Sequence, residues 1–239
     1  MTTAPSIQLS GHFDIKGERL FAPISLNLPA GRWTCLLGRS GVGKSTLVRL
    51  IAGLECRGDF TGEIATSDGH ALADRVSFMA QSDLLLPWLS VLENIALGAR
   101  LRGLQPDIAR AKSLLRNVGL AAYENEKPAA LSGGMRQRAA LARTLLEDRP
   151  VALLDEPFSA LDAATRVEMQ DLSAQMLAGK TVLMVTHDPA EAVRLGHQII
   201  VLTPKGANLW ETPVTSPLRD QYTPETLECQ AALLSYLRT

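Results

Sequence analysis

One glycine-rich segment narrows the possible folds of this chain more than any other feature. Residues 38–46 read GRSGVGKST and fit the pattern G-x-x-x-x-G-K-[ST]. The apolar run Trp33–Leu37 before it predicts a strand, and Leu47, Leu50 and Ile51 after it recur at helical spacing. A strand, a glycine turn and a helix in this order bring backbone N–H groups and a helix N-terminus to one point. The sequence therefore predicts a phosphate-binding loop at residues 38–46, called the phosphate loop below.

The residue types in the phosphate loop suit a nucleotide with a magnesium ion. Glycines let successive N–H groups converge on an anion, and Lys44 supplies a cation between the β- and γ-phosphates. Ser45 offers a hydroxyl group to Mg²⁺. The alternative, a flexible Gly/Ser turn, is disfavoured by the flanking strand and helix. We expect nucleotide contacts from Gly38, Arg39, Ser40, Gly41, Val42, Gly43, Lys44, Ser45 and Thr46.

Two adjacent carboxylates end a second apolar strand. Val151–Leu154 carries no polar residue and is followed directly by Asp155 and Glu156. Alone, such a pair is more often a helix cap or a solvated turn. Two carboxylates at the end of a buried strand, however, cost folding free energy unless they have a partner or a ligand there. Downstream of a phosphate loop, we expect Asp155 to hold Mg²⁺, directly or through water, and Glu156 to orient and deprotonate an attacking water.

A second anion-binding surface is predicted between these two motifs. Residues 131–138 read LSGGMRQR and are called the signature segment below. Ser132 is suited to cap the helix that follows, and Gly133 and Gly134 leave the N-terminal amides of that helix uncovered. A simple helix cap explains Ser132 but not two glycines, which cost helix stability.

The rest of the chain predicts an α/β fold. Strands alternate with helices around Val151–Leu154, Thr181–Val185 and Ile199–Leu202, which indicates a parallel sheet. Residues 7–28 and 60–80 contain short runs in which apolar and polar residues alternate. These runs predict a small antiparallel layer.

A helical part and a tail complete the predicted organisation. Residues from about 84 to 147 look wholly helical, and we expect an all-helical subdomain at about 84–135, inserted in a domain that spans 1–203. Residues 204–239 are rich in Pro and Gly near their start and predict a loose tail with one terminal helix.

Composition excludes some classes of protein. The chain has 25 acidic and 24 basic residues, which argues against a nucleic-acid binder that depends on bulk phosphate attraction. No stretch approaches the roughly 18 apolar residues of a membrane span. Met1–Leu9 lacks the pattern of a signal peptide. Cys35, Cys56 and Cys229 are scattered, which suits reduced thiols better than disulfides or a zinc site.

The motifs together resemble those of the ATP-binding-cassette (ABC) ATPases. The signature segment is similar to the family signature, and Gln81 after Val76–Met79 resembles the Gln-loop residue that senses Mg²⁺ and the attacking water. Ser159–Asp162 is similar to the D-loop, and His187 resembles the switch histidine that contacts the γ-phosphate. The resemblance covers about residues 7–203.

This resemblance implies a P-loop NTPase core and a head-to-tail homodimer. Each ATP would lie between the phosphate loop of one subunit and Ser132, Gly133 and Gly134 of the other, with Asp162 nearby. The implied catalytic residues are Glu156, His187 and Gln81, and Ser45, Gln81 and Asp155 are the implied Mg²⁺ ligands. Family members place an aromatic residue that stacks on adenine at the position of Ile15 here, and Phe13 and Phe21 are nearby aromatic alternatives.

The residues after Gln81 bear on the partners. Leu86-Pro87-Trp88 resembles importers of nitrate, sulfonate and taurine, including relatives that carry thiamine-precursor pyrimidines. Trp88 either belongs to the core of the helical lobe or to an apolar patch for a membrane partner. The resemblance implies a peripheral subunit on the cytoplasmic face of a bacterial inner membrane. It would work with integral-membrane permease subunits and, indirectly, with a periplasmic solute-binding protein, but with no nucleic acid.

Three alternatives to an importer ATPase remain: the ATPase of an exporter or of a lipid- or protein-release complex, a mechanical ATPase, and a binding module without catalysis. A mechanical ATPase of the chromosome type would normally carry a coiled-coil or zinc insert, and the interval from Gln81 to Ser132 holds none. A binding module without catalysis would be expected to lack Glu156 or His187, and both are present.

Overall fold

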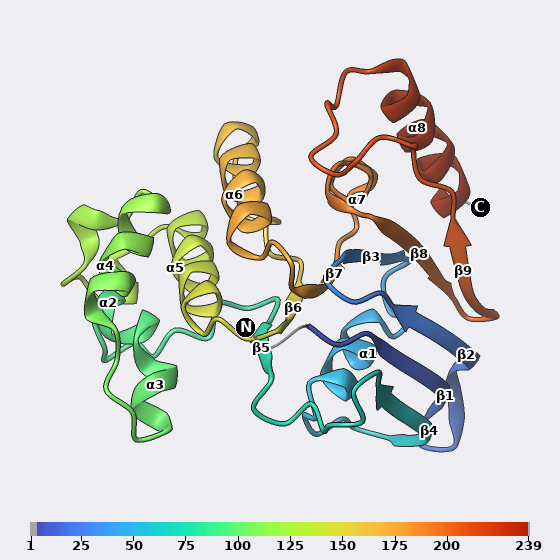
Figure 1. The fold of residues 1–239 in the computed structure, drawn as a ribbon, viewed down its shortest axis with the longest axis horizontal. Coiled ribbons are helices and arrows are strands. Elements are labelled where there is room, and N and C mark those ends of the chain that lie inside the picture. The colour runs from blue at the N-terminus through green and yellow to red at the C-terminus, as the bar shows by residue number, and fades with distance from the viewer. Residues whose placement is uncertain (1–3, 239) are drawn as a thin grey trace. The chain divides into compact units, whose positions relative to one another are not determined.

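The computed structural model describes residues 4–238, and these form two compact units. The first unit contains the chain up to Val76, Pro150–Asp155 and the chain from Ala178 onward. The second unit contains Ser77–Arg149 and Glu156–Leu177. Each unit is described by itself, and Figure 1 shows the labelled elements of both.

Most strands belong to the first unit. Its elements are β1 (Ile7–Ile15), β2 (Glu18–Leu28), β3 (Trp33–Gly38), α1 (Lys44–Ile51), β4 (Asp59–Thr66), β6 (Val151–Asp155), β7 (Thr181–Val185), α7 (Pro189–Leu195), β8 (Gln198–Thr203), β9 (Gly206–Trp210) and α8 (Pro224–Arg238). Strand β5 (Val76–Met79) lies where the chain leaves this unit.

The central sheet of the first unit is mainly parallel, as the alternation of strands and helices predicts. Its strands lie in the order β6-β7-β3-β8-β9, and only β9 is antiparallel to its neighbour. Every residue of β3, β6 and β7 is buried. Burial on both faces explains why these strands read as unbroken apolar runs rather than as alternating patterns.

A three-stranded antiparallel sheet forms the other layer of this unit, in the order β2-β1-β4. Along β1, Ile7 and Leu9 are buried while Gln8 and Ser10 are exposed, as the alternating sequence predicts. The expected antiparallel layer is therefore confirmed for β1, β2 and β4. The expectation was wrong for β5, which is not a strand of this sheet. The four-residue strand is too short for its sequence to indicate its partner.

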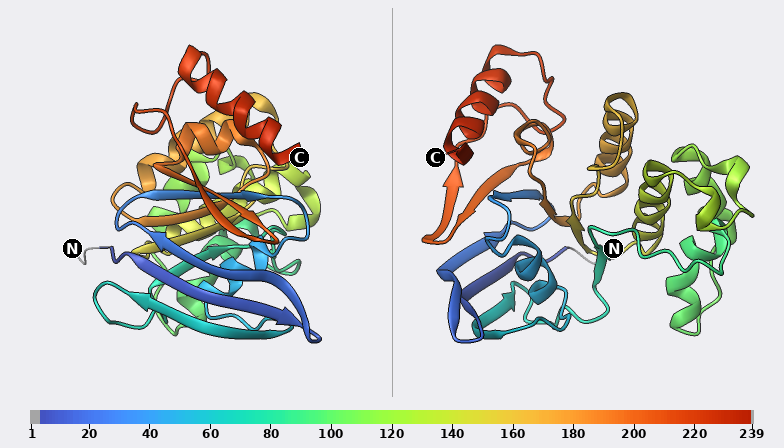
Figure 2. Two further views of the ribbon diagram at one scale, coloured as in Figure 1. Left: turned by 90° about the vertical axis from the view of Figure 1, so that its right-hand side faces the viewer. Right: turned by 180° about the vertical axis from the view of Figure 1, so that it is seen from behind.

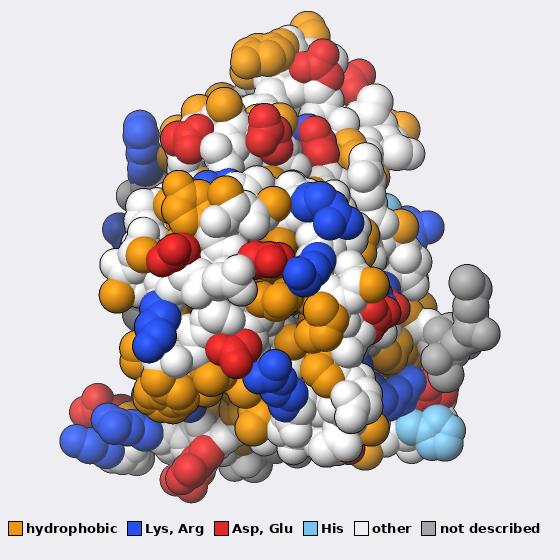
Figure 3. All heavy atoms as spheres, turned by 90° about the vertical axis from the view of Figure 1, so that its left-hand side faces the viewer, with side chains coloured by type: hydrophobic (Ala, Val, Ile, Leu, Met, Phe, Trp, Pro, Cys, Tyr) orange, Lys and Arg blue, Asp and Glu red, His pale blue; other side chains and the backbone are white. Residues whose placement is uncertain are grey.

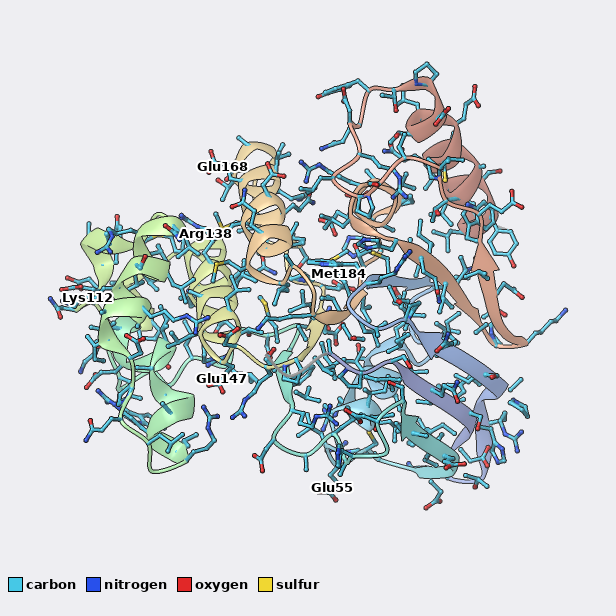
Figure 4. All side chains as sticks on the ribbon, viewed as in Figure 1. Glu55, Lys112, Arg138, Glu147, Glu168 and Met184 are labelled. Atoms are coloured by element: carbon cyan, nitrogen blue, oxygen red, sulfur yellow. The ribbon has the colours of Figure 1, made fainter. Side chains whose placement is uncertain are left out.

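The second unit is largely helical. Its helices are α2 (Val91–Ile95), α3 (Leu97–Leu101), α4 (Ile108–Asn117), the 3₁₀ turns η1 (Ala121–Tyr123) and η2 (Pro128–Ala130), α5 (Gly133–Leu146) and α6 (Ala163–Met176). Helices α2, α4 and α6 pack on α5. Arg138 of α5, labelled in Figure 4, donates a hydrogen bond of 2.6 Å to the carbonyl of Val118 at the end of α4.

Packing on α5 extends this unit beyond the subdomain expected at about 84–135. Helix α6 follows the strand β6 in the chain, yet it packs against α5 and so belongs to the helical unit. Within residues 4–238, no helix is long and apolar enough to cross a membrane.

The C-terminal segment contains the expected terminal helix. The segment is not a loose tail, because it packs on the rest of the first unit. Strand β9 pairs with β8, and α8 packs on α7 and ends beside the end of β9 (Figures 1 and 2). Between them, the buried Arg219 donates hydrogen bonds to the carbonyls of Val193, Gly196 and Pro213. These three backbone acceptors fix the connection because a buried guanidinium without acceptors would be costly.

Candidate functional site

The phosphate loop joins β3 to α1, as its sequence predicts. Gly43 immediately before α1 has a φ of 104°, a conformation that side chains disfavour. A Cβ atom on Gly43 would also lie 2.9 Å from the ring of Phe21 and 3.0 Å from Leu20. The local fold therefore needs glycine here, and the loop keeps the amide groups at the start of α1 accessible to an anion.

Lys44 places its charge inside the phosphate loop. The residue is only 8% exposed, and its ammonium group donates hydrogen bonds to the carbonyls of Gly38 at 2.8 Å and Arg39 at 3.0 Å. Ser45 beside it is exposed, whereas Val42 packs inward. A bound phosphate would thus meet a cation that the loop already holds in place.

Oxygen ligands suited to Mg²⁺ lie in the same unit. Asp155 ends β6 and is 4% exposed, and α1, which carries Ser45, packs against β6 and β7. Carboxylate and hydroxyl oxygens are the ligands that Mg²⁺ prefers, together with phosphate oxygens of a nucleotide. The described part of the chain has no cluster of three His, Cys, Asp or Glu residues suited to a metal. A carboxylate and a hydroxyl in one unit fit a site that an ion would share with the phosphate oxygens of a nucleotide.

His187 follows β7 in a turn with a fixed backbone. The hydroxyl of Thr186 donates to Glu191 at 2.6 Å and accepts from the N–H of Asp188 at 3.0 Å. Asp188 in turn caps α7 by accepting from the N–H of Ala190. The turn leaves His187 exposed at the carboxyl end of a parallel strand, where ligands of α/β sheets commonly bind.

In the second unit, the side chains of Glu156 and Gln81 form a hydrogen bond. Gln81 donates from Nε2 to Oε2 of Glu156 at 3.3 Å. Glu156 has a φ of 51°, a left-handed conformation that is uncommon for a residue other than glycine and that concentrates at functional sites. The structure thus brings together two residues that are predicted from the sequence to act on the attacking water.

A second glutamine, Gln137, holds the backbone of Glu156 and was not singled out from the sequence. Gln137 of α5 is buried and donates from Nε2 to the carbonyl of Glu156 at 2.9 Å and to Oγ of Ser159 at 3.1 Å. Its Oε1 accepts from the N–H of Ala160 at 2.7 Å. The only available signal was its place in the signature segment, one helical turn after Gly134. Gln137 therefore links the signature helix to the loop after Glu156.

The two glycines of the signature segment have different surroundings. Ser132 caps α5 by accepting from the N–H of Met135 at 3.2 Å, as expected. A Cβ atom on Gly134 would lie 3.0 Å from the carbonyl oxygen of Ala160, so close packing explains this glycine. A Cβ atom on Gly133 would meet only the guanidinium of Arg136, at 4.0 Å. The surroundings of Gly133 within the chain thus leave room for a side chain.

Asp162 starts α6 as its N-terminal cap. It accepts a hydrogen bond from the N–H of Thr165 at 3.1 Å, and this bond lowers the pKa of the Asp162 carboxyl from its usual value. The side chain is exposed and stays charged near neutral pH.

The aromatic alternatives to Ile15 are both part of the core. Phe13 and Phe21 are fully buried, and their rings stack on each other with centroids 6.2 Å apart. Neither ring presents a face to a ligand. Ile15, at the end of β1, is partly exposed.

The chain has relatives of known family. The profile of the family described as ABC transporter matches residues 21–159. An uncharacterized ABC transporter ATP-binding protein of Haemophilus influenzae is 47% identical over 188 residues, which cover 78% of this chain and 77% of that protein. The aliphatic sulfonates import ATP-binding protein SsuB 2 of Agrobacterium fabrum is 46% identical over 188 residues, covering 78% of this chain and 71% of the relative. SsuB 1 of Mesorhizobium japonicum is 43% identical over 234 residues, covering 91% and 86%.

A solved structure shares the fold. The dimeric structure of a post-hydrolysis state of the ATP-binding cassette MJ0796, bound to ADP and Pi, superposes with a TM-score of 0.73 at 30% identity. The similarity covers 90% of this chain and 99% of that one.

Proposed function

The chain belongs to the ABC transporter family, and from this membership we propose that it is the ATP-binding and ATP-hydrolysing subunit of an ABC importer. The observation that carries the hydrolytic part is the hydrogen bond between Gln81 and Glu156, with Glu156 held in a left-handed conformation directly after Asp155. A binding module that had lost catalysis would have no reason to keep this arrangement.

Each candidate residue has a definite part in this proposal. The amides of the phosphate loop and the ammonium group of Lys44 bind the β- and γ-phosphates, and His187 contacts the γ-phosphate. Ser45, Asp155 and Gln81 would hold Mg²⁺, and the ion would neutralise charge on the phosphate oxygens. Glu156 accepts a proton from the attacking water, and Gln81 orients that water.

The signature segment is proposed to act on the nucleotide of a second subunit. The open space at Gly133 supports this, because the fold alone does not explain a glycine there. The cap Ser132 leaves the first amides of α5 as an anion site, and the exposed Asp162 adds a residue near the same surface. The dimeric state of MJ0796 is in keeping with a head-to-tail homodimer.

The solute is proposed to be a small organic anion of the aliphatic sulfonate class, since the SsuB relatives are named for sulfonate import. The other subunits would be integral-membrane permeases and a periplasmic solute-binding protein, with this chain peripheral on the cytoplasmic face of the inner membrane. Trp88 is 65% exposed, so it is not part of the core of the helical unit. Leu84, four residues before it, is exposed as well, and we propose that both apolar side chains contact a permease helix.

The proposed ATP binding is tested by Lys44→Ala. Removing the ammonium group takes a cation away from the phosphates, and we expect the Kd for ATP to rise about 10- to 100-fold. Titration calorimetry with ATP measures this change. Lys127→Ala, at an exposed lysine of the second unit, is the control and should bind ATP normally. No hydrolysis of MgATP by the unchanged protein would refute the proposed function itself.

The proposed permease surface is tested by Trp88→Asp. A charge on this surface should reduce co-purification with the membrane subunits about tenfold, because exposed tryptophans at interfaces often carry much of the binding energy. The ATPase rate of the separate subunit should stay within about twofold. Figure 3 views the face with α2, α3 and α4, where hydrophobic side chains lie among charged ones. Tyr123→Asp, on η1 of the same unit, is the control, and equal losses for both variants would contradict the assignment.

A further inference from the structure

One buried glutamine of α5 makes hydrogen bonds with three residues of the turn that begins at Glu156. Gln137 is 6% exposed. Its Nε2 donates to the carbonyl of Glu156 at 2.9 Å and to the hydroxyl of Ser159 at 3.1 Å, and its Oε1 accepts from the N–H of Ala160 at 2.7 Å. These contacts use both N–H donors of the amide and its oxygen, so they hold the side chain in one orientation.

The turn needs such support because its backbone is unusual. Glu156 has a φ of 51°, and none of residues 156–162 is a glycine that would adopt a left-handed conformation freely. Backbone angles set the direction in which a side chain leaves the chain. A change in the φ of Glu156 would therefore move its carboxylate away from Gln81, which now donates to it at 3.3 Å.

Helix α5 also approaches this turn closely one helical turn before Gln137. A Cβ atom on Gly134 would lie 3.0 Å from the carbonyl oxygen of Ala160, the residue whose N–H donates to Gln137. A side chain at position 134 would thus push the turn away from the reach of Gln137. The glycine and the glutamine together seat the turn on the start of α5, within the second unit.

We propose that Gln137 is a positioning residue for ATP hydrolysis, which fixes the backbone of Glu156 so that its carboxylate lies beside Gln81. The proposal rests on the proposed ATPase function and adds a residue that acts only through Glu156. Because the phosphates are proposed to bind at the phosphate loop of the first unit, Gln137 should affect the hydrolytic step and not the binding of ATP.

The test is Gln137→Met, which keeps the length and most of the volume of the side chain but removes its hydrogen bonds. We expect kcat for ATP hydrolysis to fall about 10- to 100-fold, because misplacement of a catalytic group by about 1 Å can cost about 100-fold. The KM for ATP should stay within about twofold. Gln137→Asn keeps the amide on a shorter side chain and should show the same split, so either folded variant tests the proposal. Phosphate release over a range of ATP concentrations gives both constants.

The matched control is Gln170→Met. Gln170 is a buried glutamine of α6 in the same unit, 2% exposed, and the substitution removes the same hydrogen-bonding groups. Its melting temperature should fall about as much as that of Gln137→Met, while kcat stays normal. An equal fall of kcat in both variants would show that general destabilisation slows hydrolysis, and would contradict a positioning role.

A double variant tests whether Gln137 acts through Glu156. In the Glu156→Gln background the general base is already lost, so adding Gln137→Met should slow the residual hydrolysis by no more than about twofold. A further loss of tenfold or more would show that Gln137 acts on another group, and the inference would be wrong. A normal kcat in a folded Gln137 variant, or a raised KM with an unchanged kcat, would also overturn it. Absence of hydrolysis in the unchanged protein would instead refute the proposed function.

Discussion

Glu156→Gln is expected to bind ATP like the unchanged protein and to hydrolyse it at least about 100-fold more slowly. A glutamine cannot accept the proton of the attacking water, and loss of a general base typically costs about 10²- to 10⁴-fold in rate. The amide oxygen can still accept the hydrogen bond that Gln81 donates to Glu156, so the local geometry is kept. Release of phosphate and binding of ATP, measured on the same preparation, give the two quantities.

The control for this variant is Glu168→Gln. Glu168 is an exposed glutamate of α6 in the same unit, labelled in Figure 4. Neutralising it changes the net charge by the same amount, and we expect normal hydrolysis. A hydrolysis rate in Glu156→Gln within tenfold of the unchanged protein would show that another group is the base. Reduced ATP binding in that variant would mean that Glu156 acts mainly in binding.

The backbone conformation of Glu156 explains how its side chain comes to lie beside Gln81. Its φ of 51° turns the chain sharply after β6, and the carbonyl accepts from Gln137 and from the hydroxyl of Ser159. These contacts hold a conformation that an isolated chain would rarely adopt. The sequence shows two adjacent acids at the end of a strand, but not that only the first is buried or that a glutamine of another helix fixes the turn.

Local patterns predicted what local interactions determine. The phosphate loop between β3 and α1, the cap at Ser132 and the buried parallel strands all follow from neighbouring residues in the chain. Each needs only a few residues in the right order, because turns and caps are set by hydrogen bonds within one helical turn.

Long-range contacts set the features that the sequence did not predict. Strand β9 forms because its register matches β8, and Arg219 donates to three carbonyls, two at the end of α7 and one in the loop after β9. Phe13 and Phe21 looked available for stacking on a base, yet their pairing across β1 and β2 buries both rings. Sequence periodicity cannot tell an aromatic that packs inside from one that faces a ligand.

Gly133→Asp is expected to reduce ATP hydrolysis about 1,000-fold while leaving the chain folded and able to bind ATP in its own phosphate loop. If the signature segment covers the nucleotide of a second subunit, an aspartate there faces a phosphate, and juxtaposed like charges cost several kcal/mol. The same substitution favours the fold, because it removes a helical glycine and adds an acid to the first turn of α5, which has none. The melting temperature should therefore stay the same or rise, which rules out unfolding as the cause.

The control variant, Ala109→Asp, places an aspartate in the first turn of another helix of the same unit. Ala109 is an exposed residue in the first turn of α4, and Ala109→Asp should keep normal hydrolysis. Normal hydrolysis by Gly133→Asp would show that no phosphate approaches Gly133, and the head-to-tail arrangement would be wrong.

Mixing two variants with different defects, at an ATP concentration that the Lys44→Ala loop does not bind, decides whether the site is shared between subunits. A Lys44→Ala subunit lacks a working phosphate loop but keeps its signature segment, and a Gly133→Asp subunit has the reverse defect. In a head-to-tail dimer of the two, one nucleotide site combines the intact loop of one subunit with the intact signature segment of the other. We therefore expect the mixture to recover hydrolysis that neither variant has alone. Sites formed within one subunit would give no recovery, because each chain would carry its own defect.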